Sequence, residues 1–439
     1  MKPSATVAPE DLHVVFLVNF VAPNLIAVCQ EMSQRVGRFT ILSSVAMESN
    51  RDWQTDWSDL DVRVQKTWTI TRHPTHPSGY REVNYIHVPL DTIGQLRRLN
   101  PDAIVSLELG ARTAWSSLYS RWHRNCAHVT AVYASERSES GRGRLRHWLR
   151  RRLLRRTDWV TYNGPSCRRL VRSLGADPAR LSPWDYAADP HKPFRGDRTP
   201  HVDRTSIRML SVGQLSERKG VMQAMDQLSD WAAANPDISV TWNLVGDGPL
   251  KSDIESRPTA ANLTLVMHGH CAPEQIAEHY RSNDVMLFPT LADEWGLVVD
   301  ESLMSGLPVI GSCHSQAVNT LLRDGEQGFQ YDPESPGSLA MALDRMLAMP
   351  DAAYQQMPIA ARATGSARTP MASADQLVDA VCHAIAAQRG HPIDLQSASH
   401  HPSQAGNDSG PVSSTGSQST QAMMASQAAA VTKATVTGP

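Results

Sequence analysis

The sequence has no long apolar run and almost no net charge. No stretch approaches the roughly 18 consecutive apolar residues of a transmembrane helix. The N-terminal MKPSATVAPEDLHVVFLVNF places an acidic pair before a short apolar segment, which is the reverse of a signal peptide. Lysine and arginine (42) nearly balance aspartate and glutamate (44), so global charge gives no reason to expect nucleic acid as a partner. We therefore expect a cytoplasmic protein whose charges act locally.

Patterns that would indicate disulfides or a metal are also missing. The cysteines form no CxxC pair and show no metal-ligand spacing with histidine. They read as free thiols in a reducing compartment: Cys29, Cys126, Cys167, Cys271, Cys313 and Cys382. We expect neither a metal site nor a bound cofactor.

The length of 439 residues favours two domains. Short apolar runs alternate with helical patterns, which is typical of parallel sheets flanked by helices. Strands are expected at residues 14–18, 39–42, 103–107 and 129–133, and then at 208–212, 239–245, 263–267, 285–288 and 309–310. The predicted fold class is α/β, with two doubly wound Rossmann-like domains.

Composition sets the predicted boundaries. A first domain covers residues 1–190, a proline-rich and charged linker 191–204, and a second domain 205–350. Residues 351–390 read as helices that pack back toward the first domain. Residues 391–439 are dominated by serine, glutamine, alanine, threonine and glycine, and are expected to be a disordered tail.

The stretch DEWGLVVDESLMSGLPVIGS, residues 293–312, follows an expected strand and opens a short helix. Loops at the carboxyl ends of parallel strands are where open α/β sheets bind ligands. Free amides at Leu297 and Val298 suit a phosphate. Glu301, one turn further along, is placed to accept hydrogen bonds from vicinal hydroxyls such as those of a ribose. The remaining acids, Glu294 and Asp300, are expected to be solvated.

Three further strand ends carry polar or glycine-rich loops. SVGQLSERKG, residues 211–220, places Arg218 and Lys219 just before a helix, where a lysine can hold a diphosphate. LVGDGP and VMHGHC follow the next two strands, and their glycines let backbone approach a ligand closely. Because these strand ends share one edge of the sheet, we expect the loops to converge on one site.

The order VGQLSERKG, LVGDGP, VMHGH and LFPTLADEWGLVVDESLMSGLPVIGS resembles the nucleotide-binding half of GT-B retaining glycosyltransferases of family 4. The resemblance is strong over residues 207–349 and weaker over 155–181. It implies that Lys219 holds the donor diphosphate, that Glu301 binds the nucleotide ribose and that Asp293 contacts the donor sugar. The implied donor-binding set is completed by Gly213, Gln214, Arg218, Gly246, Gly248, His270, Gly296, Leu297 and Val298.

Two positions depart from the family pattern. Gln214 stands where an arginine is common, which removes one charge from the leaving-group site. Asp293 stands where a glutamate is usual, and its shorter side chain bears on the donor sugar that is bound. Neither change by itself implies an inactive protein.

The first half offers weaker candidates for acceptor binding. The candidates follow expected strands, and they are Asn19, Glu108, Ser135 and Glu136. For the two acids, Glu108 and Glu136, a helix-capping or solvated role is also open. The glycine-containing first loop and the histidine that family members often carry are absent here.

The segment from Arg142 to Arg156, RGRLRHWLRRRLLRR, is a basic amphipathic helix. It suits the surface of an anionic membrane, which would put the protein at the inner face of the cytoplasmic membrane. A surface helix whose leucines face the core is equally open. RNA is disfavoured, because no aromatic stacking platform accompanies the arginines.

Together these features and the resemblance predict a metal-independent glycosyltransferase, and the resemblance implies that it retains the anomeric configuration. Its donor would be a UDP- or GDP-linked sugar, and its acceptor a sugar or lipid-linked hydroxyl in exopolysaccharide, lipopolysaccharide or other glycoconjugate synthesis. The main alternative is an inactive partner protein that binds the sugar nucleotide in a polysaccharide assembly system. An epimerase or phosphorylase of the same architecture is disfavoured by the paired acids Asp293 and Glu301.

Overall fold

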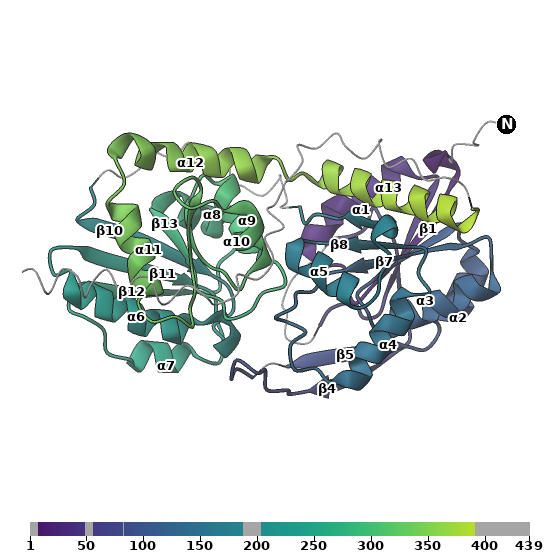
Figure 1. Cartoon of the computed structure of the whole chain (residues 1–439), viewed down its shortest axis with the longest axis horizontal. Helices are drawn as coiled ribbons and strands as arrows, with labels where there is room; N and C mark the ends of the chain where they lie inside the picture. Colours follow the sequence, from purple (N-terminus) through teal and green to yellow (C-terminus); the bar gives the residue numbers. More distant parts are fainter. Residues whose placement is uncertain (1–7, 49–55, 82, 188–202, 391–439) are drawn as a thin grey trace, which may run out of the picture. The chain divides into compact units, whose positions relative to one another are not determined.

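A computed structural model describes residues 8–48, 56–81, 83–187 and 203–390 (Figure 1). Most of the predicted linker and all of the predicted tail lie outside these residues. The described chain contains two parallel sheets with helices on their faces. The prediction of two doubly wound Rossmann-like domains is confirmed.

The first domain is built on a seven-stranded parallel sheet in the order β3-β2-β1-β6-β7-β8-β9. Its central strands are buried on both faces, which explains their continuous apolar runs. The strands are β1 (His13–Val18), β2 (Arg38–Ser43), β3 (Asp61–Val64), β6 (Ala103–Leu107), β7 (Ala127–Val132), β8 (Trp159–Tyr162) and β9 (Leu181–Pro183). The helices are α1 (Pro23–Arg35), α2 (Thr92–Leu99), α3 (Ala111–Trp122), α4 (Arg144–Leu154) and α5 (Pro165–Ser173). An antiparallel hairpin is formed by β4 (Thr67–Arg72) and β5 (Asn84–Pro89).

The second domain is built on a six-stranded parallel sheet in the order β12-β11-β10-β13-β14-β15. The strands are β10 (Ser206–Val212), β11 (Ser239–Val245), β12 (Leu263–Gly269), β13 (Val285–Phe288), β14 (Val309–Ser312) and β15 (Gly328–Tyr331). The helices are α6 (Val221–Ala234), α7 (Lys251–Ser256), α8 (Pro273–Ser282), α9 (Leu297–Met304), α10 (Gln316–Leu321) and α11 (Ser338–Leu347). The chain order reverses between β10 and β13, which is the point where such sheets form a ligand-binding crevice.

The last two helices join different cores. Met357 of α12 (Asp351–Ser366) belongs to the apolar core of the second sheet. Ala374, Leu377 and Val381 of α13 (Pro370–Gln388) belong to the core of the first sheet, and α13 contacts α1, β7 and β8 (Figure 1). The described chain therefore returns to the first domain only after α12.

No helix within the described ranges combines the length and apolarity needed to cross a membrane. The six cysteines are free.

Candidate functional site

The predicted donor residues gather at the carboxyl edge of the second sheet. The loop after β10 carries Arg218 and Lys219, and the loop after β13 carries Asp293 and leads into α9. Strands β10 and β13 are hydrogen-bonded neighbours on either side of the chain reversal. Residues 75 positions apart in sequence are thereby brought together at the place where the topology opens the edge of the sheet.

Lys219 and Asp293 form the central ion pair of this edge. The Lys219 Nζ lies 2.5 Å from Asp293 Oδ2, and Arg218 Nη1 lies 3.3 Å from the same oxygen. Arg218 also donates to the carbonyl of Ala292 at 2.9 Å. The side chains of Lys219 and Asp293 are only 19% and 15% exposed, so water screens their interaction weakly.

The pKa of Asp293 reflects two opposed effects. Burial by itself raises it, but Lys219 and Arg218 outweigh burial and hold the pKa below the usual range of an aspartate. Asp293 is therefore a carboxylate at neutral pH. It can accept hydrogen bonds from hydroxyl groups, and its cationic partners can in turn be recruited by an anion.

The loops around this pair are held by glycines that no other residue could replace without strain. Gly246 has φ of 136°, and a Cβ there would lie 2.0 Å from the carbonyl oxygen of Gly213. Gly296 has φ of 108°, and a Cβ there would lie 2.8 Å from the ring of Phe288. The backbones after β10 and β11 can approach this closely, and Gly296 can lie against the Phe288 ring, only because these glycines carry no side chain.

Gly296 is the N-cap of α9, and no side chain of a described residue caps that helix. Leu297 and Val298 occupy its first turn, where backbone N–H groups have no partner within the helix. The helix start adjoins the loop that carries Asp293. An anion there would meet both these amides and the cations of the neighbouring loop.

Glu301 lies one turn along α9, and a tyrosine fixes its carboxylate. The hydroxyl of Tyr280, on α8, donates to Glu301 Oε2 at 3.0 Å. Tyr280 is fully buried, and burial together with the charge of Glu301 raises its pKa well above the usual value. Tyr280 is thus a permanent hydrogen-bond donor. Sequence reasoning missed it because no local pattern links it to Glu301.

The expectation that Asp300 is solvated is wrong. Asp300 is fully buried, accepts a hydrogen bond from the indole of Trp295 and lies 3.0 Å from Arg368 Nε. Arg368, between α12 and α13, also stacks 4.6 Å from the Trp295 ring. Burial raises the pKa of Asp300 to about 6, although Arg368 opposes the shift. On the helix, Asp300 points away from Glu301 and toward Trp295 and Arg368. Through these contacts it anchors the loop before α9. Glu294 is partly buried.

The remaining predicted donor residues are placed as follows. Gln214 is exposed, and its carbonyl accepts from the amide of Ser216 at 3.0 Å. Gly248 lies against Leu215, which ties the loop after β11 to the loop after β10. His270 is exposed directly after β12, the edge strand of the sheet.

In the first domain, the structure brings Asn19 and Glu108 together. They follow β1 and β6, the neighbouring strands at that sheet's own reversal point. Buried Arg112 donates to the side chains of both, and Asn19 Nδ2 lies 3.5 Å from Glu108 Oε2. Glu108 has φ of 67°, a left-handed conformation that is uncommon for a residue with a side chain. Such outliers gather at functional sites, and the Glu108 carboxylate is 44% exposed.

Ser135 and Glu136 have other partners. Ser135 is buried and exchanges hydrogen bonds with Ser138 inside a turn. Glu136 is exposed and accepts from Ser166 and Arg169. Ser135 therefore holds the loop after β7, whereas Glu136 faces solvent beside α5.

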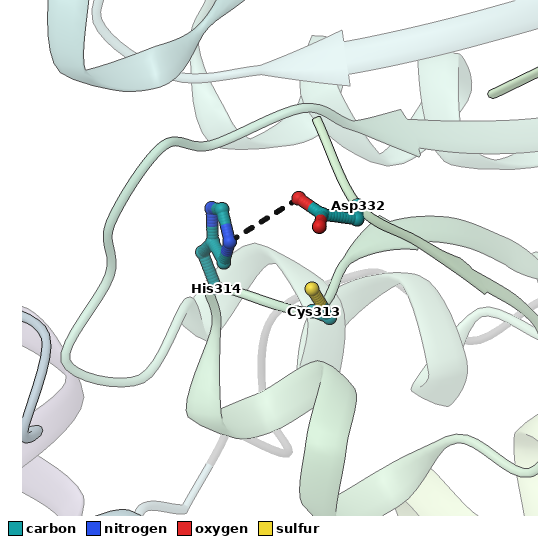
Figure 2. A group of neighbouring side chains, drawn as sticks. All are labelled: Cys313, His314 and Asp332. Carbon is teal, nitrogen blue, oxygen red and sulfur yellow. Dashed lines mark ion pairs between the residues drawn. The ribbon is translucent and has the colours of Figure 1, made fainter. Parts of the chain in front are cut away.

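One group of described residues has the geometry to hold a metal ion, which the spacing in the sequence did not indicate. Cys313, His314 and Asp332 offer ligand atoms within 4.8 Å of one another at the ends of β14 and β15 (Figure 2). His314 Nε2 lies 3.4 Å from Asp332 Oδ1. Cys313 and His314 are adjacent in sequence, but Asp332 reaches them only through the pairing of two strands. His314 also accepts the Asp293 amide through its carbonyl, so this group borders the donor edge.

Comparison with known proteins finds similarity to glycosyltransferases. Residues 206–349 match the family described as Glycosyl transferases group 1. The fold is GT-B, and it is shared with Anabaena HepE, solved in complex with UDP, at a TM-score of 0.61 with 16% identity over 83% of this chain and 98% of that one. Sucrose-phosphate synthase from Thermosynechococcus elongatus gives a TM-score of 0.60 with 15% identity over 83% and 97%.

Sequence relatives cover less of the chain. D-inositol 3-phosphate glycosyltransferase from Acidothermus cellulolyticus is 27% identical over 202 residues, which are 43% of this chain and 45% of the relative. Sulfoquinovosyl transferase SQD2 from Arabidopsis thaliana is 30% identical over 118 residues, 26% of this chain and 22% of that protein. The match thus spans less than half the length of either relative.

Proposed function

We propose that this protein is a glycosyltransferase that moves a sugar from a nucleoside diphosphate sugar to an acceptor hydroxyl, with retention at the anomeric carbon. The observation that carries the proposal is the pairing of Lys219 with Asp293 beside the free start of α9. A cation, a carboxylate and helix amides at one strand edge match a diphosphate joined to a sugar.

In this proposal each donor residue has one task. Lys219, Arg218 and the amides of Leu297 and Val298 hold the diphosphate. Glu301, oriented by Tyr280, accepts hydrogen bonds from the ribose hydroxyls. Once the diphosphate draws Lys219 away, Asp293 has an oxygen available for a sugar hydroxyl. One fold neighbour supports a uridine nucleotide, since HepE was solved with UDP and with UDP-glucose, and a GDP-linked sugar is the other donor to test.

The chemistry follows from these contacts. The bond between the anomeric carbon and the diphosphate oxygen breaks, and negative charge grows on the leaving group. Lys219, Arg218 and α9 stabilise that charge without a metal ion or a cofactor. The acceptor oxygen forms its bond on the face that the diphosphate leaves, and its proton passes to the departing phosphate oxygen. Asp293 binds the sugar and is not the nucleophile.

The acceptor would be held by the first domain. Asn19 and the strained Glu108 are the strongest candidates, because they meet at that sheet's reversal point and Glu108 stays accessible. In this proposal Glu108 orients the acceptor hydroxyl, whose proton leaves with the phosphate oxygen. Ser135 supports its loop, and Glu136 lies at the edge of a separate cavity.

Contact with the inner face of the cytoplasmic membrane is part of the proposal. Leu145, Trp148 and Leu149 of α4 are 71%, 56% and 48% exposed, so these three residues do not face the core, whereas Leu154 at the end of the helix does. An exposed apolar stripe among arginines is suited to an anionic lipid surface. We place the protein in the cytoplasm, acting in exopolysaccharide, lipopolysaccharide or other glycoconjugate synthesis.

Calorimetric titration with UDP and with GDP tests nucleotide binding, and release of the nucleotide from a panel of UDP- and GDP-sugars with membrane extract tests transfer. The proposal expects saturable binding of one nucleotide and extract-dependent release, with the product retaining its anomeric configuration by NMR. Binding without release under any condition would favour an inactive sugar-nucleotide-binding partner, for which the uncharged Gln214 is the structural argument. Absence of binding would reject both.

A further inference from the structure

The first domain contains a cavity of about 400 Å³ that the donor chemistry does not use. It is lined by the loop after β7, the first two turns of α4, and Leu170 and Leu174 at α5. The volume lies within the range of small-molecule sites.

Three arginines that share one face line this cavity. Arg142, Arg146 and Arg150 are spaced by four residues, so they stack along one side of α4 and the turn before it. All three approach a single carboxylate, that of Glu139, which is 10% exposed. One carboxylate cannot neutralise three guanidinium groups, so a positive charge remains.

The second acid on the wall does not remove that excess. Glu136 lies 2.8 Å from Arg169, which is not among the residues that line the cavity. The wall also carries Arg144, the first residue of α4. Four arginines thus face two acids, one of which has a cationic partner elsewhere.

The arginines also keep donors free. Among the described residues, the Nε groups of Arg146 and Arg150 are buried and have no hydrogen-bond partner. Arg150 as a whole is only 9% exposed. A buried donor without an acceptor costs free energy, which a bound acceptor would recover. The arginines also repel one another: burial, and then the charge of Arg142, lower the pKa of Arg146 to about 10.

The start of α4 faces the same cavity. Its N-cap is Gly143, with φ of 84°, no side chain caps the helix, and its first turn holds no acid. Gly143 and Arg144 line the cavity, so the positive end of the helix adds to the arginines. Arginine forks and helix amides are together the donors that a phosphate dianion prefers.

We infer that this cavity is a binding site for a phosphate monoester, carried by the acceptor of the proposed transfer reaction. The inference rests on the proposed function only in assigning the phosphate to the acceptor molecule. The site itself is defined by Arg142, Arg146, Arg150 and the start of α4. The phosphate belongs either to a soluble acceptor or to a lipid headgroup. The apolar residues Leu145, Trp148 and Leu149 lie on the adjoining side of α4 and would accommodate the second.

Direct binding tests the inference without any transfer assay. Inorganic phosphate and glycerol 3-phosphate are titrated into the full chain by calorimetry with UDP present in excess, so that the donor site is filled. The same titrations use Arg142→Gln, Arg146→Lys and, as the control, Arg152→Gln, which removes one charge from the exposed side of α4. Circular dichroism verifies that each variant is folded.

Saturable binding is expected, weakened at least tenfold by Arg142→Gln and Arg146→Lys and changed less than twofold by Arg152→Gln. Sedimentation with phosphatidylcholine vesicles that contain phosphatidic acid or phosphatidylglycerol separates the sources. A headgroup source predicts a preference for phosphatidic acid that Arg142→Gln removes, whereas a soluble source predicts no preference between the two lipids. The inference is overturned if neither probe nor either vesicle shows binding that depends on Arg142, or if all three variants weaken binding equally. UDP binding in the same samples reports separately on the proposed function.

Discussion

Lys219 and Asp293 meet at 2.5 Å across the two strand ends where the order of the second sheet reverses. The pair explains how one buried edge can hold a strong cation in the absence of a ligand. A diphosphate must therefore displace the Asp293 carboxylate before it can pair with Lys219.

Removing that carboxylate should therefore separate nucleotide binding from transfer. In Asp293→Asn, Lys219 and Arg218 lose their anionic partner, so affinity for UDP should rise by roughly three- to tenfold. Transfer should fall by about two orders of magnitude, because the sugar hydroxyl loses a charged acceptor. Calorimetry and nucleotide release measure the two effects. The control Asp226→Asn breaks the exposed ion pair with Arg257 and should change neither; weaker UDP binding in Asp293→Asn would show that the carboxylate serves the nucleotide.

The hydroxyl of Tyr280 should matter mainly through Glu301, since its contact with the carbonyl of Val298 is longer, at 3.5 Å. Tyr280→Phe removes the donor that orients the carboxylate and should weaken UDP binding by roughly three- to thirtyfold with little loss of stability. Tyr331→Phe is the matched control, because the Tyr331 hydroxyl is buried without a hydrogen-bond partner among the described residues. That control should be as stable as the parent or more so. Equal effects of both changes on UDP affinity would remove Tyr280 from the site.

The glycine at the start of α9 should not tolerate a side chain. Gly296→Ala forces a left-handed alanine against the Phe288 ring and should cost about 1–3 kcal/mol of stability together with UDP binding. Gly337, the N-cap of α11, also has a positive φ but has no atom within 4 Å of the added methyl group. Gly337→Ala thus reports the backbone strain alone. Denaturant unfolding of the pair isolates the steric part, and identical losses would contradict the close packing of this turn.

The buried carboxyl of Asp300 should give a pH-dependent signature. Its raised pKa means that the folded state holds the proton more tightly than the unfolded state, so its contribution to the free energy of unfolding falls as pH rises from about 4 to about 6. Asp300→Asn cannot titrate. The stability of the variant relative to the parent should therefore improve between pH 4.5 and pH 7, as measured by urea unfolding. A shift in the opposite direction would mean that Arg368 dominates over burial.

Chelation addresses the metal-independent part of the proposal. If Lys219, Arg218 and α9 supply the charge for the leaving group, EDTA should leave UDP binding and nucleotide release unchanged. Cys313→Ser, in the group shown in Figure 2, should be equally neutral. Loss of transfer on chelation, restored by zinc in the parent but not in Cys313→Ser, would contradict metal independence.

Much of the fold follows from local patterns, and the failures have local causes. Strands 103–107 and 285–288 were predictable to the residue because they are buried on both faces. Strand 239–245 was also predictable to the residue, and it buries one face fully. Strands β3 and β9 were missed, since they lie at sheet edges and are partly exposed. Strands β8 and β15 were also missed, although both are largely buried. Helix α12 was not resolved as a separate element, because Pro358 in its interior interrupts the helical pattern.

The site divides in the same way. The residues of one loop or helix start, such as Lys219 and Glu301, could be proposed from their position after a strand. Tyr280, Arg368 and Arg112 could not, because their partners lie on other elements and only tertiary packing brings them together. Asp300 shows the limit most clearly: its neighbour Glu301 is partly exposed, whereas Asp300 faces the interior and needs a charged partner.

The most direct measurement is the release of nucleotide from the preferred nucleoside diphosphate sugar by four proteins: the parent, Lys219→Ala, Glu301→Gln and the control Arg257→Ala. Arg257 follows α7 and precedes the amino end of β12, whereas the donor residues lie at the carboxyl ends of the strands. Its exposed ion pair with Asp226 is therefore separate from the donor site. Release should persist in the parent and in Arg257→Ala, and should fall at least a hundredfold in the other two. Full activity in folded Lys219→Ala or Glu301→Gln would contradict the assignment of this edge as the donor site.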